Sequence, residues 1–416
     1  MIAYPSLAAI RDTFPEKTMT IVCSRGVAPF AKSLDLFDRI EILDDSSFFK
    51  FGREYLYFFA RTFRQFDTVV NLEVHSRLAT LISLFTCARN RIGFHRHDFK
   101  KFNHVNSHSL YFGLSGSIPD YYEQIPNLLG ARPIPLDILT QRYRKIFVAK
   151  EKAVDSTKRE LENEPKEGDE KKTDPIERAN LNTKEEIKEE IKDGIKAKKK
   201  AGTKVTTALD QADHDEAANT FVQLFGITVK RKSATLQIGM GAVCSDLAPE
   251  RMLSPERWKI ILERELGPLL KKDTAVTIHQ YGAPSDSTFY ERLNSLITSP
   301  SDSSRDNILY LKQKEGLLEL SNLAGFGSIH DTTRHIMEHL DFYAGIDTSL
   351  IHIARLLGIK NASFWGPTAP HNYLRTFPNL EEKTFYLRTP CSPCVHFTKH
   401  PPCKGNNICM NHNESI

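Results

Sequence analysis

DFYAGIDTSLIHIARLLGIKNASFWGPTAP, residues 341–370, alternates short apolar runs with polar turns. The first run ends at Gly345, as expected at the carboxyl end of a buried strand. Side-chain oxygens at 347–349 stand where a helix should begin, since Asp, Thr and Ser cap free backbone N–H groups. That helix is apolar at helical spacing, and a second strand, 362–365, leads into the turn that begins at Gly366. This order predicts a parallel sheet, in which ligands bind at the carboxyl ends of the strands.

The same alternation of strands and helices runs through both halves of the chain. In the second half we predict strands at 234–238, 275–279 and 307–311, a glycine loop at 239–242 and a turn at 321–325. In the first half we predict helices at 5–14 and 76–87 and strands at 19–23, 39–43 and 66–72, the first and last of them buried. Strands that alternate with helices favour βαβ units. Two α/β domains are therefore expected.

The composition of the chain limits the kinds of protein that it can be. The 416 residues are 40% hydrophobic and carry a net charge of +4, so nothing demands nucleic acid as a partner. No apolar run reaches the ~18 residues of a transmembrane helix, and the first residues lack the pattern of a signal peptide. We therefore expect a cytoplasmic protein of two to three domains.

Residues 149–219 differ sharply from the rest, because they are rich in Lys and Glu and nearly free of aromatic residues. Such a segment cannot bury enough apolar surface to form a core, so it is predicted to be a disordered insertion or linker. It separates an N-terminal domain, 1–148, from a C-terminal domain, 220–384, and residues 385–416 form a Cys-containing tail. The alternative is that the Lys residues at 196–200 contact anionic lipid, although the interleaved Glu weakens this interpretation.

Several polar residues of the second half have the chemistry of a nucleotide-sugar site. Arg251 lies just before a predicted helix, where a guanidinium can clamp a phosphate. Asp286 and Asp347 follow strands and can accept hydrogen bonds from ribose or sugar hydroxyls. Each also has a purely structural explanation, since Asp347 can be a helix cap and His352 an ordinary helix residue. Neither GxGxxG nor GxxxxGK[ST] occurs, which argues against a dinucleotide-dependent dehydrogenase and a P-loop enzyme.

Short motifs in both halves occur in the order of one known family. In the second half they are GMGA (239–242), RMLSPERW (251–258), YGAPSD (281–286), NLAG (322–325), GIDTSLIHIARLLG (345–358) and FWGPTAP (364–370). In the first half they are PSLAAIRDTFP, FDTVVNL and RIGFHR. On these motifs the chain resembles the ADP-heptose:lipopolysaccharide heptosyltransferases of glycosyltransferase family 9, over nearly everything except 149–219.

The resemblance implies a GT-B fold, in which two Rossmann-like domains face each other across a cleft. The C-terminal domain would bind a nucleotide-sugar donor such as ADP-heptose. The N-terminal domain would bind the acceptor, a lipopolysaccharide inner core or another lipid-linked glycan. Transfer would be inverting and metal-independent, with no cofactor. The enzyme would work at the cytoplasmic face of the inner membrane, held peripherally by its lipid acceptor and by basic patches.

The resemblance also assigns roles to individual residues. Asp347 would take the catalytic position and meet the sugar. Residues 241–242 would approach the phosphates, Arg251 would neutralise them, Asp286 would meet the ribose, and residues 366–368 would line the nearby cleft. The donor-binding positions implied in this way are Gly241, Ala242, Arg251, Asp286, Thr348, His352, Gly366, Pro367 and Thr368.

Three features depart from the family pattern. Leu350 stands where the family has Gly, and Leu253-Ser254 replaces its Trp-Pro pair. The family's first strand and the Gly-Asp turn after it, whose Asp is the proposed general base, have no counterpart. We therefore predict an N-terminal domain without its first strand, and we expect the true start of the protein to lie upstream of Met1. The alternatives are a non-catalytic nucleotide-sugar or glycan-binding protein and a GT-B-type sugar epimerase.

The tail carries Cys391, Cys394, Cys403 and Cys409 and looks like the cysteine-bearing end of the family. A CxxC pair followed by two further thiols is compatible with a structural four-thiolate zinc site, although the second pair is not CxxC. Free thiols are the alternative.

Overall fold

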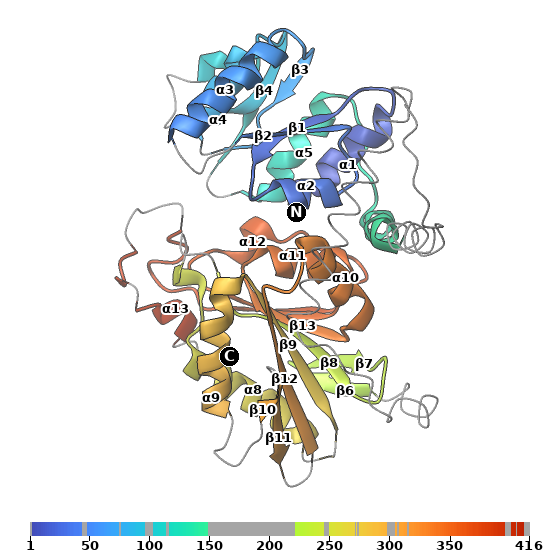
Figure 1. Ribbon diagram of the computed structural model, residues 1–416, viewed down its shortest axis with the longest axis vertical. Helices are drawn as coiled ribbons and strands as arrows, with labels where there is room; N and C mark the ends of the chain where they lie inside the picture. The colour runs from blue at the N-terminus through green and yellow to red at the C-terminus, as the bar shows by residue number, and fades with distance from the viewer. Residues whose placement is uncertain are drawn as a thin grey trace, which may run out of the picture.

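A computed structural model of the chain shows two α/β bodies, an N-terminal one up to residue 148 and a C-terminal one from residue 221 onward (Figure 1). The structure describes residues 2–43, 48–74, 76–95, 103–113, 116–148, 221–244, 249–270, 272, 274–297, 304–305, 308–313, 316–395, 401–404 and 406–411. The predicted linker, 149–219, lies outside these residues. None of the described helices has the length and apolar character needed to cross a bilayer.

One eight-stranded sheet forms the centre of the C-terminal body. Its strands are β8 (Leu236–Gly241), β9 (Val276–Gly282), β10 (Ser304–Arg305), β11 (Ile308–Gln313), β12 (Gly316–Ala324), β13 (Phe342–Ile346), β14 (Asn361–Trp365) and β15 (Glu382–Tyr386). Their order is β10-β11-β12-β9-β8-β13-β14-β15. The pairs from β12 to β15 are all parallel, and β11 is antiparallel to both of its neighbours. A short hairpin, β6 (Phe221–Leu224) and β7 (Ile227–Lys230), precedes this sheet.

Helices pack on both faces of this sheet. They are α8 (Pro255–Leu270), α9 (Ser287–Ile297), α10 (Ile329–His339), α11 (Ser349–Leu356), α12 (Pro370–Tyr373) and α13 (Ile408–Asn411). Trp258 of α8 is fully buried in one apolar core and Ile336 of α10 in another. Consecutive residues of β13 reach the two cores, Phe342 the first and Tyr343 the second, because side chains alternate across a strand.

Two predicted boundaries in this body are wrong. The glycine loop predicted at 239–242 is mostly strand, because β8 continues through Gly241 and pairs there with Gly345 of β13. The turn predicted at 321–325 is the end of β12, which pairs with β9 as far as Ala324. In both places the hydrogen-bond ladder with a parallel neighbour outweighs the turn preference of Gly, Ser and Asn.

The N-terminal body contains two separate parallel sheets. The first pairs β1 (Thr20–Ser24) with β2 (Arg39–Leu43), and the second has the order β3 (Thr68–Val70), β4 (Asn90–His95) and β5 (His108–Tyr111). Its helices are α1 (Tyr4–Thr13), α2 (Ala28–Ser33), α3 (Phe48–Thr62), α4 (Arg77–Phe85) and α5 (Ile118–Leu128), and residues 136–148 are also helical. The first element of the described chain is a helix and not a strand, as the sequence indicated.

The strands predicted to be buried at 19–23 and 66–72 are less buried than expected. All five residues of β1 are half-buried, and β3 has one exposed and two half-buried residues. Within the described part of the chain, each of these strands is paired on one side, with β2 and β4 respectively. They are therefore sheet edges, which are less covered than interior strands.

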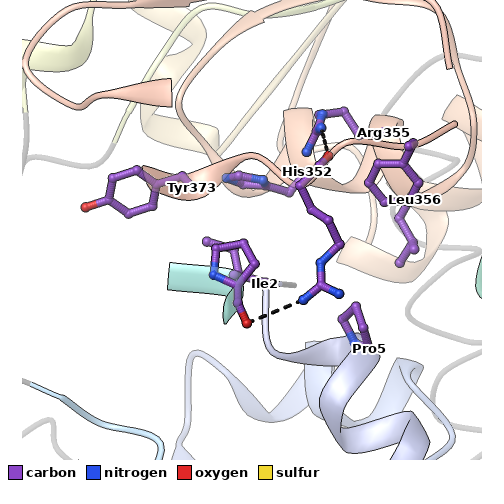
Figure 2. A pocket seen from close by; sticks show the side chains of 9 residues that line it. Ile2, Pro5, His352, Arg355, Leu356 and Tyr373 are labelled. Atoms are coloured by element: carbon purple, nitrogen blue, oxygen red, sulfur yellow. Dashed lines mark hydrogen bonds between the residues drawn. The ribbon is translucent and has the colours of Figure 1, made fainter. Parts of the chain in front are cut away.

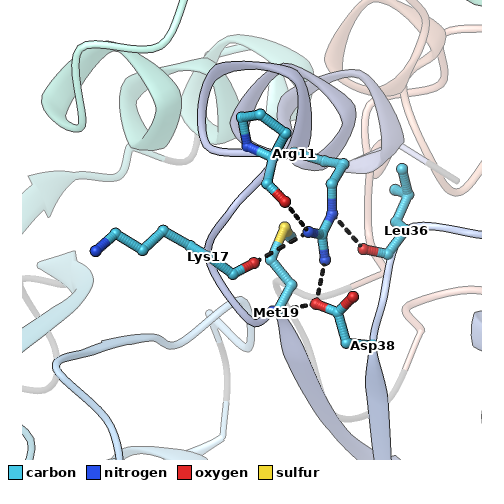
Figure 3. A network of polar contacts seen from close by, with 6 residues as sticks. Arg11, Lys17, Met19, Leu36 and Asp38 are labelled. Atoms are coloured by element: carbon cyan, nitrogen blue, oxygen red, sulfur yellow. Dashed lines mark hydrogen bonds and ion pairs between the residues drawn. The ribbon is translucent and has the colours of Figure 1, made fainter.

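Arg11, near the end of α1, forms hydrogen bonds and an ion pair with the segments that lead into β1 and β2 (Figure 3). Its guanidinium donates to the backbone oxygens of Leu36 at 2.9 Å and Lys17 at 3.0 Å, and it forms an ion pair with Asp38 at 2.6 Å. The Asp38 carboxylate also accepts the backbone N–H of Met19 at 2.7 Å. The hydrogen bond from Arg11 holds the pKa of the Asp38 carboxyl below its ordinary value. One side chain thus fixes the segments before β1 and β2 relative to α1.

An apolar cluster joins the two bodies. Tyr4 of α1 and Ile351 of α11 are both fully buried in it. The helix at 136–148 lies beside α10 (Figure 1). Arg144 of this helix donates to the backbone oxygen of Leu357 at 2.8 Å. The face of the C-terminal body that carries α10 and α11 is therefore the one that meets the N-terminal body.

Candidate functional site

Asp347 lies at the carboxyl edge of the C-terminal sheet, where two neighbouring loops meet. It follows β13, whose five residues are all buried, and it is itself 5% exposed. Because β14 is parallel to β13, the loop after β14 reaches the same edge. There the hydroxyl of Thr368 donates to Asp347 Oδ2 at 2.8 Å. The two polar turns of the 341–370 stretch are thus joined by a hydrogen bond.

Arg251 and His352 complete the surroundings of this carboxylate. Arg251, in a 3-10 turn before α8, places Nη1 3.5 Å from Asp347 Oδ2. His352, near the start of α11, places Nε2 3.5 Å from Oδ1. None of the three side chains is more than 19% exposed. A buried carboxylate is therefore flanked by one permanent cation and one titratable imidazole.

These contacts set the protonation states of the site. Burial alone would raise the pKa of Asp347, but the hydrogen bond from His352 and the charge of Arg251 outweigh it, so this pKa lies below its ordinary value. Burial lowers the pKa of His352 more than Asp347 raises it. Near pH 7 the site therefore holds an ionised Asp347 and a neutral His352.

Two polar atoms beside Asp347 lack a hydrogen-bond partner among the described residues. They are the hydroxyl of Thr348, which precedes α11 without capping it, and Nε of Arg251. Buried polar atoms normally have a partner, so unpaired ones need an explanation such as a ligand. Both atoms can donate a hydrogen bond, which is what a phosphate or a sugar oxygen accepts.

The C-terminal tail supports the loop after β14 from behind. The backbone N–H of Cys394 donates to the carbonyl of Pro367 at 2.9 Å. A Cβ on Gly366 would lie 2.7 Å from Cys409 Sγ, so a side chain there would collide with α13. Of the predicted cleft residues 366–368, Thr368 reaches Asp347 and the other two contact the tail.

The four tail cysteines gather behind this same loop. Cys394 and Cys409 are 5% and 7% exposed. Burial, and then the nearby thiols of Cys394, Cys391 and Cys403, raise the pKa of Cys409 to about 12. Throughout the part of the chain that the structure describes, no three His, Cys, Asp or Glu side chains are placed to hold a metal ion. The four thiols form no disulfide, and the structural four-thiolate zinc site stays a prediction.

Gly241 and Ala242 are packed in the interior of the C-terminal body. A Cβ on Gly241 would lie 2.1 Å from the hydroxyl of Tyr343, which is fully buried. The N–H of Ala242 donates to the hydroxyl of Tyr290 at 3.1 Å. The glycine thus makes room for an aromatic ring, and the N–H that would face a phosphate already has a partner. The phosphate-binding role of these residues stays a prediction, without support from their packing.

Asp286 lies at the same edge of the sheet as Asp347, two strands away. It follows β9, which β8 separates from β13. Its carboxylate accepts the backbone N–H of Ala283 at 2.8 Å and the hydroxyl of Ser285 at 3.2 Å, which closes the turn before α9. The residue is half-buried. Its contact with a ribose stays a prediction.

A pocket opens between the two bodies beside His352 (Figure 2). Its lining residues are His352, Arg355, Leu356, Tyr373, Arg375 and Phe377 from the C-terminal body and Ile2, Pro5 and Pro119 from the N-terminal body. Figure 2 shows Ile2 and Pro5 across from the segment that carries His352 and Tyr373. The ionisable side chains that line this pocket therefore all come from the C-terminal body.

Three polar residues of this pocket were not predicted from the sequence. Arg355 forms two hydrogen bonds with Glu382, at 2.6 and 3.0 Å, and Arg375 pairs with Glu123 of the N-terminal body. Tyr373 lines the same pocket, and burial, followed by the charge of Asp347, raises the pKa of its phenol. Tyr373 follows the FWGPTAP motif by three residues, but no residue pattern indicates that α12 brings it back toward the site.

Comparison with known proteins gives structural matches alone. No family model and no curated protein matches the sequence. The E. coli ADP-heptose lps heptosyltransferase II matches with a TM-score of 0.52 and 10% identity, over 94% of this chain and 87% of that chain. A glycosyl transferase family 9 structure from Veillonella parvula DSM 2008 has a TM-score of 0.54 and 11% identity, over 95% and 83%. E. coli heptosyltransferase WaaC with ADP has a TM-score of 0.52 and 12% identity, over 92% and 88%.

These matches extend over both bodies of the chain. The N-terminal and C-terminal bodies, each with parallel strands and packed helices, align with most of the length of each of these proteins. The chain therefore has the α/β GT-B fold that the sequence predicted.

Proposed function

We propose that the protein is a glycosyltransferase that transfers a heptose, or a related sugar, from a nucleotide diphosphate to a lipopolysaccharide core or another lipid-linked glycan. An acceptor hydroxyl attacks the anomeric carbon of the sugar, the bond from that carbon to the diphosphate breaks, and the nucleotide diphosphate leaves. The reaction inverts the anomeric configuration and proceeds without a metal. Support for ADP-heptose as the donor comes from the fold, which is shared with heptosyltransferases bound to ADP and to ADP-2-deoxy-2-fluoro heptose.

The observation that carries this proposal is the buried Asp347 at the carboxyl edge of the sheet, with hydrogen-bond donors around it. Its ionised carboxylate accepts hydrogen bonds from sugar hydroxyls. Arg251, 3.5 Å away, offsets the negative charge of a diphosphate. The unpaired hydroxyl of Thr348 and the start of α11 present further donors to the same anion.

His352 is the residue that we assign to the proton of the acceptor hydroxyl. It lines the pocket and is neutral near pH 7, whereas burial keeps Tyr373 protonated and the two arginines of the pocket stay cationic. With Nε2–H directed at Asp347, the lone pair of His352 lies on Nδ1. A neutral imidazole oriented by a carboxylate is a suitable general base.

A binding protein without turnover is the second candidate, and one observation favours it. The N-terminal body contributes Ile2, Pro5 and Pro119 to the pocket, and none of these can accept a proton. If His352 does not serve as the base, the described pocket binds a nucleotide sugar without transferring it.

Calorimetric titration of the full chain tests the donor site. Wild-type protein and Asp347→Asn are titrated with ADP-heptose and, separately, with ADP. We expect Asp347→Asn to weaken ADP-heptose binding by roughly tenfold to a hundredfold, since hydrogen bonds to a charged group contribute ~1.5–3 kcal/mol. Binding of ADP alone should be retained, because Asp347 contacts the sugar.

Asp331→Asn is the matched control, because Asp331 also lies at a helix start and accepts the Ser328 hydroxyl at 2.9 Å, but on α10 and outside the pocket. Equal affinity of wild type and Asp347→Asn for ADP-heptose would reject the sugar contact. Release of ADP in the presence of a truncated lipopolysaccharide acceptor separates the two candidates. Tight donor binding without such release favours the binding protein.

A further inference from the structure

Helices α3 and α4 carry a concentration of exposed apolar side chains on the N-terminal body. Leu56 and Tyr57 are 67% and 60% exposed on α3, with Phe63 just beyond its end at 42%. On α4, Leu78 and Phe85 are 47% and 44% exposed. Leu56 and Phe63, like Leu78 and Phe85, are seven residues apart, so each pair lies on one side of its helix axis. Two apolar stripes therefore face solvent.

The two stripes form one surface. The ring of Phe59 contacts both Phe63 and Phe85, with centroids 5.4 and 6.0 Å apart. The backbone N–H of Arg64 donates to the carbonyl of Thr86 at 2.9 Å, so the carboxyl ends of α3 and α4 lie together. Figure 1 shows the two helices side by side, on the part of the N-terminal body away from the C-terminal body. We call this surface the α3–α4 face; it consists of Leu56, Tyr57, Phe63, Leu78, Leu84 and Phe85.

Arginines surround the α3–α4 face. Those that are exposed are Arg53, Arg61, Arg64, Arg77 and Arg89. The one acidic residue on the two helices is Glu54, which is half-buried, and α4 has none. Arg53 and Arg61 are 65% and 63% exposed even though each approaches a glutamate. The exposed charged side chains that the structure describes on α3 and α4 themselves are therefore all arginines.

We propose that the α3–α4 face docks on the surface of a membrane that contains anionic phospholipid. Leucine and aromatic side chains enter the boundary between headgroups and acyl chains, and arginines bind lipid phosphates at the same depth. Charge complementarity selects this occupant, because every exposed charged residue that the structure describes on the two helices is an arginine, and arginines complement a negatively charged leaflet. The protein lies on the bilayer and does not cross it.

This proposal deepens the proposed function, because a lipid-linked acceptor is presented at a membrane surface. It can fail independently of that function, however, since none of the residues of the α3–α4 face lines the pocket beside His352. Donor binding and membrane binding are therefore separate measurements on the same variants.

Co-sedimentation of the full chain with vesicles tests the proposal. The probes are vesicles of phosphatidylcholine alone and of phosphatidylcholine with phosphatidylglycerol, at physiological ionic strength. We expect binding to the anionic vesicles and little to the neutral ones. Leu56→Ser with Tyr57→Ser should weaken binding about tenfold or more, as loss of buried apolar area predicts. Arg53→Glu with Arg64→Glu should weaken it at least as much, because each cation near an anionic leaflet contributes roughly fivefold.

Matched controls lie on the C-terminal body. Ile260→Ser removes an apolar side chain that is 51% exposed on α8, and Arg388→Glu reverses an exposed charge after β15. Both controls should bind vesicles as wild type does, and all variants should keep wild-type affinity for ADP-heptose. Failure of wild type to bind the anionic vesicles would overturn the proposal, as would α3–α4 variants that bind as well as wild type. A wild-type dimer that the α3–α4 variants convert to monomer, measured by light scattering, would instead show that a second copy covers this face.

Discussion

In the C-terminal body every residue of β13 and β14 is buried, whereas in the N-terminal body no residue of β1 or β3 is. All four strands follow or precede helices in the same alternating order. The difference lies in their neighbours. β13 pairs with β8 and β14, and β14 pairs with β13 and β15, but β1 and β3 are each paired on one side within the described residues.

This difference shows that a parallel strand needs a neighbour on both sides in order to hold the loop that follows it in a fixed position. A strand with two neighbours has all its backbone groups in ladders and both faces under helices. The loops that follow such strands are then held firmly, which is why Asp347 and Thr368 can meet at 2.8 Å. The loops that follow β1 and β3 lack that support. The polar side chains around Asp347 are therefore held in place by the C-terminal body.

Hydrogen exchange of backbone amides should show the largest contrast between the two bodies. Amides of β13 and β14 should open only when the whole C-terminal body unfolds, and those of β1 and β3 by local opening. Opening free energies should differ by about 5 kcal/mol or more, roughly four orders of magnitude in exchange rate. Mass spectrometry of peptides that cover these strands measures the exchange rates of their amides. Equal protection of β1 and β13 would contradict the contrast drawn here.

The second largest effect is a loss of unfolding free energy, which should be greater when a buried ion pair is broken than when an exposed one is broken. Arg355 is 3% exposed and pairs with Glu382, whereas Arg61 is 63% exposed and pairs with Glu41. Arg355→Met should cost about 3–5 kcal/mol of unfolding free energy, because it leaves a partly buried carboxylate without its cation. Arg61→Met should change stability by less than about 1 kcal/mol. Urea denaturation of both variants measures the difference, and equal losses would show that burial does not distinguish these pairs.

The core of the candidate site could be predicted from the sequence because it depends on local order. A buried strand followed by Asp347, and the next strand followed by Thr368, place both residues at one edge once the strands are parallel. Arg251 joins them from the start of a predicted helix. No tertiary information beyond strand order is needed for these positions.

The rest of the site depends on how distant segments pack, and the sequence does not contain that information in readable form. Tyr373 reaches the pocket because α12 folds back, and Ile2 and Pro119 reach it because the N-terminal body docks on α11. Gly241 shows a different difficulty. A glycine at a strand end leaves space, but the sequence does not tell whether a ligand or the ring of Tyr343 fills it.

The glycines of the two bodies provide the next contrast. In the C-terminal body a Cβ on Gly241 would lie 2.1 Å from the hydroxyl of the fully buried Tyr343, whereas in the N-terminal body a Cβ on Gly26 would meet nothing within 4 Å. Gly241→Ala should therefore destabilise by about 1–3 kcal/mol, the usual cost of overpacking. Gly26→Ala should be neutral or slightly stabilising. Thermal unfolding of the two variants checks this, and an unchanged melting temperature for Gly241→Ala would mean that the ring of Tyr343 moves aside freely.

The smallest expected effect concerns acid stability, which the buried histidines of the C-terminal body should control. Burial, and then the charges of His339 and Arg334, lower the pKa of His335 to about 4, and its Nδ1 lies 2.6 Å from the hydroxyl of Tyr281. Between pH 6.5 and 4 the unfolded chain therefore binds a proton on His335 that the folded chain does not, so stability falls as pH falls. The slope is at most about 1.4 kcal/mol per pH unit for one histidine, or roughly 1 kcal/mol between pH 7 and 5.5.

His335→Gln keeps a hydrogen-bonding side chain opposite Tyr281 but cannot take up a proton. Its unfolding free energy should therefore decrease less than that of wild type when urea denaturation is repeated at pH 5.5. Some acid sensitivity should persist, because burial also lowers the pKa of His279 to about 3. If wild type and His335→Gln lost the same stability between pH 7 and 5.5, the acid sensitivity would have to be assigned to groups other than His335.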